Sequence, residues 1–254
     1  MIIIISPAKT LKFNQYSSNL KYSEPIFAHK ALELAKHLKS YTSNDLMRLM
    51  KISEKLGDLN AQRYSQFSKN PDEKMAQPAI LTFMGDVFAG MEAWTFSDET
   101  MQRAQSNLVI LSGLYGALRP LDKIQAHRLE MGTRLPYKSY KNLYEYWRED
   151  MRKYFQQRME EQGTNVILNL ASEEYSKSID FGSLNAKVIS PQFKNYKNDE
   201  LKMISIYAKR ARGLMTRFVL ENNIENPEHL RAFDLENYIY NEDLSEFETP
   251  LFVR

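Results

Sequence analysis

Cysteine is absent from the 254-residue chain. This absence excludes disulfide bonds, a thiol nucleophile, thiolate zinc ligands and a cysteine-bound iron–sulfur cluster. Glycine and proline are scarce, at nine residues each, which argues against fibrous or low-complexity structure. The four histidines lack the i, i+4 spacing of a helical metal site. We therefore expect no metal and no cofactor.

Long hydrophobic runs are also absent. No segment approaches the ~20 apolar residues needed to cross a bilayer. The opening run Met1–Ile5 lacks the basic region and the length of a signal peptide. We expect a cytoplasmic protein with no membrane partner. A hydrophobic content of 43% and an aromatic content of 12% are typical of a folded protein, and the sequence contains no linker, so we expect one compact domain over residues 1–254.

The charges are nearly balanced but unevenly distributed. The chain has 34 Lys and Arg against 32 Asp and Glu, yet residues 219–254 carry nine acidic and two basic residues. Residues 201–218 carry five basic residues and no acidic one. Such segregation is typical of a protein with an anionic partner. Charge alone favours a simpler interpretation, a solvated basic face paired with the acidic segment, and an interaction protein whose basic face docks this segment or an acidic partner is a third possibility.

Short apolar runs rich in β-branched residues predict strands along the whole chain. They lie at Ile2–Ile5, Ala79–Phe83, Leu108–Leu111, Val166–Leu170, Val188–Ser190 and Met203–Tyr207. Helical patterns separate them, at about 31–39, from Ser97 onward and at 139–161. This alternation predicts an α/β fold, with a mixed or mainly parallel sheet surrounded by helices.

Residues 40–70 predict a helical hairpin subdomain. Its first helix begins near Thr42, Gly57 stands where that helix would end, and a second helix resumes near Asn60. Helix–hairpin–helix modules bind DNA phosphates through the backbone N–H groups of such a turn. Asp58 would place a negative charge there, and an ordinary helical hairpin fits the pattern equally well. The basic residues near the turn are Lys51, Lys55 and Arg63.

Polar segments follow four of the predicted strands. The carboxyl ends of parallel strands meet at one edge of a sheet, where open α/β sheets bind ligands. We therefore expect a common cleft at this edge, although polar loops at strand ends are also common without any function. The basic residues expected on its walls are Lys9, Arg119, Lys209, Arg210 and Arg212.

The same strand ends carry hydroxyl and carboxylate groups beside the basic ones. This mixture is richer than phosphate binding requires, so an enzyme that acts on a nucleotide, a nucleobase or damaged DNA is an alternative. The candidate catalytic residues are Ser6, Lys9, Ser112, Tyr115, Glu173 and Arg210. The glycine-rich fingerprints of dinucleotide and phosphate-loop sites are absent. Whether any reaction is catalysed stays open.

Five sequence blocks span nearly the whole chain in a fixed order. They are ISPAKTL at Ile5–Leu11, LSGLYGALRPLD at Leu111–Asp122, RLEMG at Arg128–Gly132, NLASEEY at Asn169–Tyr175 and YAKRARGLM at Tyr207–Met215. In these blocks the chain resembles the YaaA family of peroxide-stress proteins. The resemblance implies a cytoplasmic bacterial protein that limits damage from hydrogen peroxide and is associated with lower free intracellular iron.

The resemblance also implies a positively charged cleft, a helix–hairpin–helix element, and binding to duplex and distorted DNA without sequence specificity. Lys51, Lys55 and Arg63 match the hairpin region, and the five basic residues expected in the cleft lie in the family blocks. The sequence lacks the clustered His, Asp and Glu of an iron chelator, so we interpret any effect on iron as indirect. DNA binding is the first hypothesis, and catalysis on a nucleotide-like ligand in the same cleft is the second.

Overall fold

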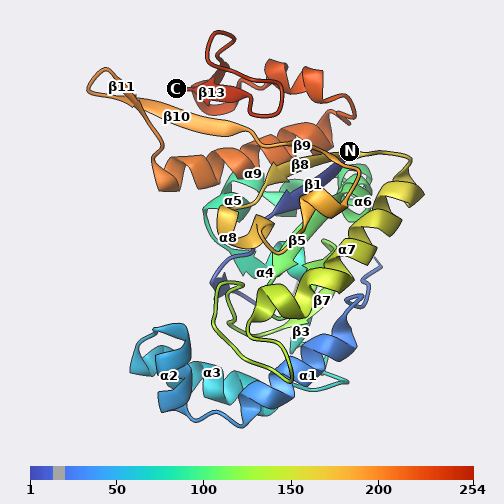
Figure 1. Cartoon of the computed structure of the whole chain (residues 1–254), viewed down its shortest axis with the longest axis vertical. Helices are drawn as coiled ribbons and strands as arrows, with labels where there is room; N and C mark the ends of the chain where they lie inside the picture. The colour runs from blue at the N-terminus through green and yellow to red at the C-terminus, as the bar shows by residue number, and fades with distance from the viewer. Residues whose placement is uncertain (14–20) are drawn as a thin grey trace.

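The computed structural model describes residues 1–13 and 21–254 and is shown in Figure 1. Its central five-stranded sheet has the order β6-β5-β1-β8-β9. The strands are β6 (Gly116–Leu118), β5 (Leu108–Ser112), β1 (Ile2–Ile5), β8 (Val166–Leu170) and β9 (Lys187–Ile189). Four of them run parallel, and β6 runs antiparallel to β5. The sheet is therefore mixed but mainly parallel, which confirms the predicted α/β class.

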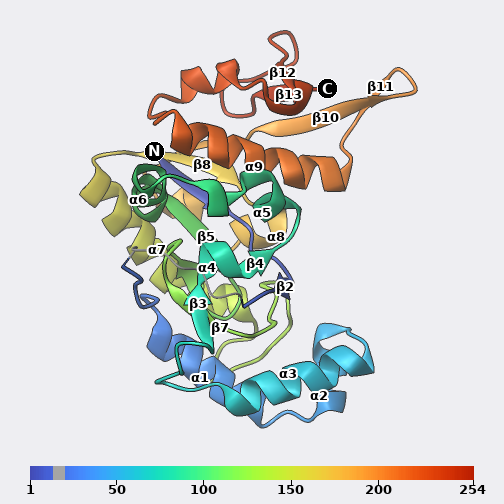
Figure 2. The same ribbon diagram turned by 180° about the vertical axis from the view of Figure 1, so that it is seen from behind.

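Strand β1 forms the centre of the core. All four of its isoleucines are fully buried, between β5 on one side and β8 on the other. Burial of each such side chain contributes roughly 1.5–3 kcal/mol to folding. Helix α7 (Leu143–Gln162) lies nearer the viewer in Figure 1 and α6 (Asp98–Asn107) lies nearer in Figure 2, on opposite sides of this sheet.

The C-terminal part of the chain forms a second layer at the top of Figure 1. A four-stranded sheet has the order β11-β10-β13-β12. These strands are β10 (Gln192–Lys197), β11 (Glu200–Lys202), β12 (Ile239–Tyr240) and β13 (Leu251–Val253). Helix α9 (Ser205–Glu221) lies beneath this sheet and packs against α5 (Asp86–Met91).

Two glycines allow α5 and α9 to approach closely. A Cβ atom added at Gly90 would overlap the Arg210 carbonyl oxygen, and one at Gly213 would overlap the Val87 carbonyl oxygen. The backbones of the two helices are therefore in direct contact, which fixes their separation.

Three helices lie at the opposite end of the molecule, α1 (Ala28–Lys39), α2 (Ser43–Met50) and α3 (Glu54–Gln66). The Thr42 hydroxyl accepts a hydrogen bond from the Asp45 N–H, and the Asp45 carboxylate accepts one from the Thr42 N–H, so a capping box starts α2. Helix α2 ends at Lys51, which adopts the left-handed conformation. The predicted helix pair is present, but its predicted turn position is wrong.

Gly57 lies inside α3 instead of ending a helix. A Cβ atom there would lie 2.6 Å from Met47 Cγ, so glycine allows α2 and α3 to pack tightly. The connection between the helices spans residues 51–53, and Asp58 belongs to α3. Glycine is common at helix ends, but at this position it serves a close contact between two helices.

The predicted strand at Ala79–Phe83 is wrong except at Phe83, and the predicted strand at Met203–Tyr207 is wrong throughout. Residues Ala79–Thr82 form helix α4, and only Phe83–Met84, strand β4, is extended. The apolar run 203–207 leads into α9, and its Met203 side chain is 65% exposed. A short apolar run does not distinguish a strand from a short helix, and apolar character does not ensure burial.

The remaining helices and strands are short. They are β2 (Thr10–Leu11), β3 (Ala76–Pro78), β7 (Lys123–Gln125), α8 (Glu173–Ser176), and the 3₁₀ helices η1 (Ala93–Thr95), η2 (Phe181–Ser183), η3 (Pro227–Ala232) and η4 (Leu235–Asn237). Strand β2 pairs with β4, and β3 pairs with β7. Among the described residues, no helix is both long enough and apolar enough to cross a membrane.

Candidate functional site

Three adjoining cavities lie where β1, β5 and β8 end. Their volumes are about 440, 20 and 660 Å³, and Lys9 lines all three. We call this joined space the cleft, and its walls are the segment after β1, residues 83–88, the loop 128–134, the start of α8, and parts of α2 and α9. It lies at the carboxyl edge of the parallel strands, as the polar strand ends predicted.

Two serines join the ends of neighbouring strands in the cleft. The Ser172 N–H donates to Ser6 Oγ at 2.8 Å, and Ser6 Oγ donates to Ser172 Oγ at 3.2 Å. Ser6 follows β1 and Ser172 follows β8. The Ser6 hydroxyl therefore both accepts and donates within the protein and links the two strand ends. Ser172 was not among the predicted residues.

Lys9 and Arg128 share one carboxylate in the cleft. Glu130 Oε1 lies 3.3 Å from Lys9 Nζ and 2.9 Å from an Arg128 guanidinium nitrogen. The Lys9 side chain is 67% exposed and the Glu130 side chain 14%. Glu130 Oε2 is buried and has no hydrogen-bond partner among residues 1–13 and 21–254. Glu130 Oε1 therefore contacts two cationic side chains, whereas the buried Oε2 contacts no hydrogen-bond donor of the described residues.

Helix α9 contributes Lys209 and Arg212 to the 440 Å³ cavity. Their i, i+3 spacing places them on one helix face, as predicted. Burial lowers the pKa of the Arg212 guanidinium. Within the part of the chain that the structure describes, this guanidinium has neither an ion pair nor a hydrogen bond. A partly buried cation without a counter-charge is a good partner for an anion.

Two of the five basic residues expected in the cleft lie elsewhere. The Arg119 guanidinium donates to the buried Asp122 carboxylate at 2.9 Å. The Arg210 guanidinium donates to Glu236 at 2.6 Å. Neither arginine lines any of the three cavities. The expectation that all five converge is therefore corrected, because each of these two is bound by a carboxylate outside the cleft.

The three basic residues expected near the hairpin turn, Lys51, Lys55 and Arg63, lie in different surroundings. Lys51 lines the 660 Å³ cavity together with Arg48 and Arg134, which were not predicted. Lys55 is exposed on α3 and lines none of the three cavities. Arg63 donates to Asn60 Oδ1 at 3.4 Å, and burial lowers its pKa. The end of α2 thus faces the cleft, whereas the basic residues of α3 do not line it.

The remaining catalytic candidates have different surroundings. Ser112 Oγ accepts from the Tyr115 N–H at 3.1 Å, and Ser112 lines the 20 Å³ cavity. The Tyr115 hydroxyl accepts from the Gln125 N–H at 3.1 Å, and burial raises the pKa of this phenol. The structure therefore places Ser112 in the cleft and holds Tyr115 in the core beside it.

Of the two neighbouring glutamates at the start of α8, only one lines the cleft. Glu173 is exposed and paired with Lys177 at 2.6 Å, which lowers the pKa of this glutamate. Glu174 lines the cleft, and its Oε1 accepts from the Gly132 N–H at 3.0 Å. Adjacent residues point in different directions at a helix start, so the sequence could not distinguish them.

His127 lines the 20 Å³ cavity and was not among the predicted site residues. Its side chain is 6% exposed, and Nδ1 lies 2.8 Å from the Gln125 carbonyl oxygen. Because a carbonyl only accepts, Nδ1 carries the proton and Nε2 is left as an acceptor. Burial lowers the pKa of His127 to about 4. The sequence around His127 contains no motif that would indicate its position beside the cavity.

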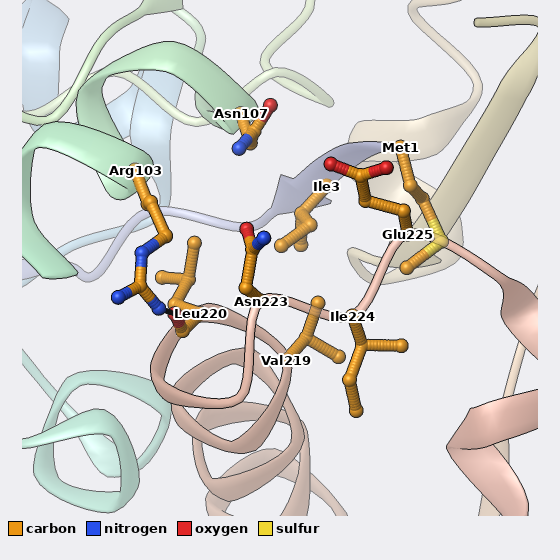
Figure 3. A pocket seen from close by; sticks show the side chains of 9 residues that line it. All are labelled: Met1, Ile3, Arg103, Asn107, Val219, Leu220, Asn223, Ile224 and Glu225. Atoms are coloured by element: carbon orange, nitrogen blue, oxygen red, sulfur yellow. Dashed lines mark hydrogen bonds between the residues drawn. The ribbon is translucent and has the colours of Figure 1, made fainter.

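A separate small cavity lies near the start of β1, at the other end of the strand (Figure 3). Its volume is about 30 Å³, and Arg103 beside it donates to the Leu220 carbonyl at 2.6 Å. Among residues 1–13 and 21–254, no three His, Asp or Glu side chains are grouped so that they could hold a metal ion.

Comparison with known protein families identifies the chain. The family model of the peroxide stress protein YaaA matches residues 1–244, almost the full length. The match includes every segment that lines the cleft. It confirms the resemblance read from the five sequence blocks. The chain therefore belongs to the YaaA family of peroxide stress proteins.

Proposed function

We propose that this peroxide stress protein binds DNA, duplex or distorted, through the cleft and without reading base sequence. The observation that carries the proposal is the Arg212 guanidinium, a partly buried cation on the cleft wall for which the described residues supply no counter-charge. Burial makes such a charge costly unless an anion compensates it. A DNA phosphate provides that anion, and guanidinium–phosphate hydrogen bonds are among the stronger ones.

The charge balance of the cleft supports the same conclusion. Seven basic residues line its three cavities against three acidic ones, Asp86, Glu130 and Glu174. The basic residues are Lys9, Arg48, Lys51, Arg128, Arg134, Lys209 and Arg212. An excess of positive charge in a concave surface attracts a polyanion and speeds its association. Contacts of this kind go to phosphates, which carry no sequence information.

The position of the hairpin extends the proposed surface. Lys51 ends α2 and lines the 660 Å³ cavity, and Lys9 connects this cavity with the one that holds Lys209 and Arg212. A single DNA segment in the cleft would therefore contact the end of α2 as well as α9. Asp58 lies in α3, outside the connection 51–53, so its negative charge is not at the turn.

Protection from peroxide follows from this proposal through shielding. DNA held in the cleft has less contact with iron-bound oxidants in solution. The chain then needs no iron site of its own, and an effect on intracellular free iron is an indirect consequence.

The experiment is a salt titration of duplex binding, followed by fluorescence anisotropy. We expect the logarithm of the association constant to fall by about 0.9 per phosphate contact for each tenfold rise in salt. Lys209→Ala and Arg212→Ala should each lower this slope by about one contact, equally for all sequences. Lys153→Ala, an exposed lysine on α7 that is paired with Glu149, is the matched control. Salt-independent binding, or variants that behave like the control, would contradict the proposal.

A second candidate function is catalysis on a nucleotide, a nucleobase or damaged DNA in the same cleft. It is favoured by the two glutamates that line the cleft, Glu130 and Glu174, because a carboxylate beside a bound substrate is a candidate proton acceptor. Turnover assays on damaged and bubble-containing DNA test it, with Glu130→Gln and Glu174→Gln as the variants. If wild type and variants give the same product yield, this candidate is rejected.

A further inference from the structure

The 440 Å³ cavity of the cleft has the size of a site for a small group. Its volume lies in the range of pockets that hold small molecules. The major groove of duplex DNA alone is about 12 Å wide, so a paired helix can lie across the cleft but cannot enter this cavity. Any part of the DNA that fills the cavity is therefore a single group that projects from the helix. The chemistry of the cavity walls indicates which group fits.

Helix α9 places two cations without carboxylate partners on the wall of this cavity. Lys209 and Arg212 lie one turn apart, and both line it. Within the part of the chain that the structure describes, neither side chain forms an ion pair, whereas Arg210 between them is held by Glu236. Two positive charges on this wall are therefore left for a ligand.

The two cations differ in how far they are buried. Lys209 is exposed, whereas Arg212 is partly buried. A ligand that contacts Lys209 therefore reaches further into the protein to contact Arg212 as well. A phosphate within the backbone of a duplex lying across the cleft stays near the rim, so a group that projects from the DNA reaches the deeper cation more readily.

The segment after β8 adds a hydroxyl donor to the same cavity. Ser6 and Ser172 both line it, and the Ser6 hydroxyl donates its proton to Ser172 Oγ. The Ser172 hydroxyl accepts this bond, and its own proton has no acceptor among residues 1–13 and 21–254. This proton is available to an oxygen atom of a ligand. The cavity thus offers two cations and one neutral donor.

We propose that this cavity binds a terminal phosphate of DNA, the phosphomonoester at a strand end or a nick. Lys209 and Arg212 share its charge, and the Ser172 hydroxyl donates to one of its oxygens. The inference rests on the proposed function, because the same cleft holds the DNA. A phosphomonoester carries about −1.5 to −2 charges at pH 7 and three acceptor oxygens, which match two cations and one hydroxyl. A backbone phosphodiester has one charge and a sugar on each side, so it matches these walls less well.

Two carboxylates that line the cavity give a test of opposite sign. Asp86 and Glu174 are these residues, and among the described residues neither forms an ion pair with Lys209 or Arg212. A negative charge beside the phosphate weakens its binding, so Asp86→Asn should strengthen it by about twofold to fivefold. Asp86 is the first residue of α5. Asp98→Asn is the matched control, because Asp98 is the first residue of α6 and lines none of the three cavities.

The experiment compares duplexes of one sequence that differ only at their ends, with binding followed by fluorescence anisotropy. One duplex carries 5′-phosphates, a second carries 3′-phosphates, a third has hydroxyl groups at all ends, and a fourth is closed by loops and has no ends. We expect one of the phosphorylated duplexes to bind at least about tenfold more tightly than the hydroxyl duplex, and the closed duplex to bind like the hydroxyl one. Arg212→Lys keeps the charge but loses the planar guanidinium, so it should reduce this preference to below about threefold. Thermal unfolding checks that each variant is folded.

The outcomes separate this inference from the function on which it rests. Equal affinity for phosphorylated and hydroxyl ends overturns the inference, even if the closed duplex binds with the expected dependence on salt. Absence of binding to the closed duplex refutes the proposed function instead, and a preference for phosphorylated ends would still support the cavity as a phosphate site. Competition with dTMP, with thymidine as its control, tests the other source of a phosphomonoester. If dTMP binds as tightly as the phosphorylated duplex, the ligand is a free nucleotide and the proposal of a DNA end is wrong.

Discussion

The contact between α5 and α9 gives a prediction whose sign is set by the structure. Gly213→Ala would normally stabilise a helix by roughly 1 kcal/mol, because alanine has the higher helix propensity. Here the added methyl group would overlap the Val87 carbonyl oxygen and lie 2.8 Å from the Met91 backbone nitrogen. Both atoms are backbone, so no rotamer change relieves the overlap.

The magnitude follows from these two effects. Overpacking against a rigid neighbour costs roughly 1–3 kcal/mol, occasionally more, and contact with backbone belongs at the upper end. Subtracting the gain in propensity leaves a net loss of about 2 kcal/mol. For a protein of this size that corresponds to a decrease in Tm of about 4–8 °C.

The assay is thermal unfolding followed by circular dichroism, together with duplex binding by the same variant. Because Gly213 lies one residue from Arg212, separation of α5 from α9 should also weaken DNA binding. Gly182→Ala is the matched control, since a Cβ atom there would lie 3.6 Å from its nearest neighbour, Asp180 Oδ1. A Gly213→Ala variant as stable as wild type would refute the argument that the two backbones are in direct contact.

Three further predictions concern other parts of the chain. His127 has a folded pKa of about 4, below its ordinary value near 6.5, so its contribution to stability is complete above pH 6.5 and is lost as the pH falls toward 4. Urea unfolding of wild type should lose on the order of 3 kcal/mol from this source over that range, and His127→Asn should flatten the profile. Thr42→Ala removes the hydroxyl that accepts from Asp45 and should cost about 0.5–2 kcal/mol, measured by urea unfolding, and an unchanged midpoint would argue against the capping box. Glu236→Gln releases Arg210 outside the cleft, so stability should change by less than about 1 kcal/mol with little effect on duplex affinity. A large gain in affinity would instead show that the acidic segment competes with DNA.

The buried strands were predictable because their signal is local. Ile2–Ile5 and Val166–Leu170 are short, apolar and bounded by polar residues, and both are central strands. The position of their carboxyl ends then follows from the parallel sheet, which is why Lys9 and Ser172 line one cleft. Lys209 and Arg212 reach it from a helix, not from the predicted strand end, so their convergence was right for a different reason.

The other site residues depend on partners that are distant in the sequence. Arg210 is held by Glu236, and nothing in the basic segment Lys209–Arg212 predicts which of its three cations is paired with a carboxylate. Arg119 pairs with Asp122, which lies only three residues further along the chain. This pairing could have been expected from the sequence, because the two residues are neighbours. His127 has no motif at all, and only its burial and its bond to Gln125 give it significance.

Lys9 borders all three cavities of the cleft and is bound on one side by Glu130. Under the proposed function, an anion that pairs with Lys9 from one cavity would leave less of this positive charge for an anion in the next. Two occupants of the cleft would then compete for one side chain, and each would lower the affinity of the other by the same factor.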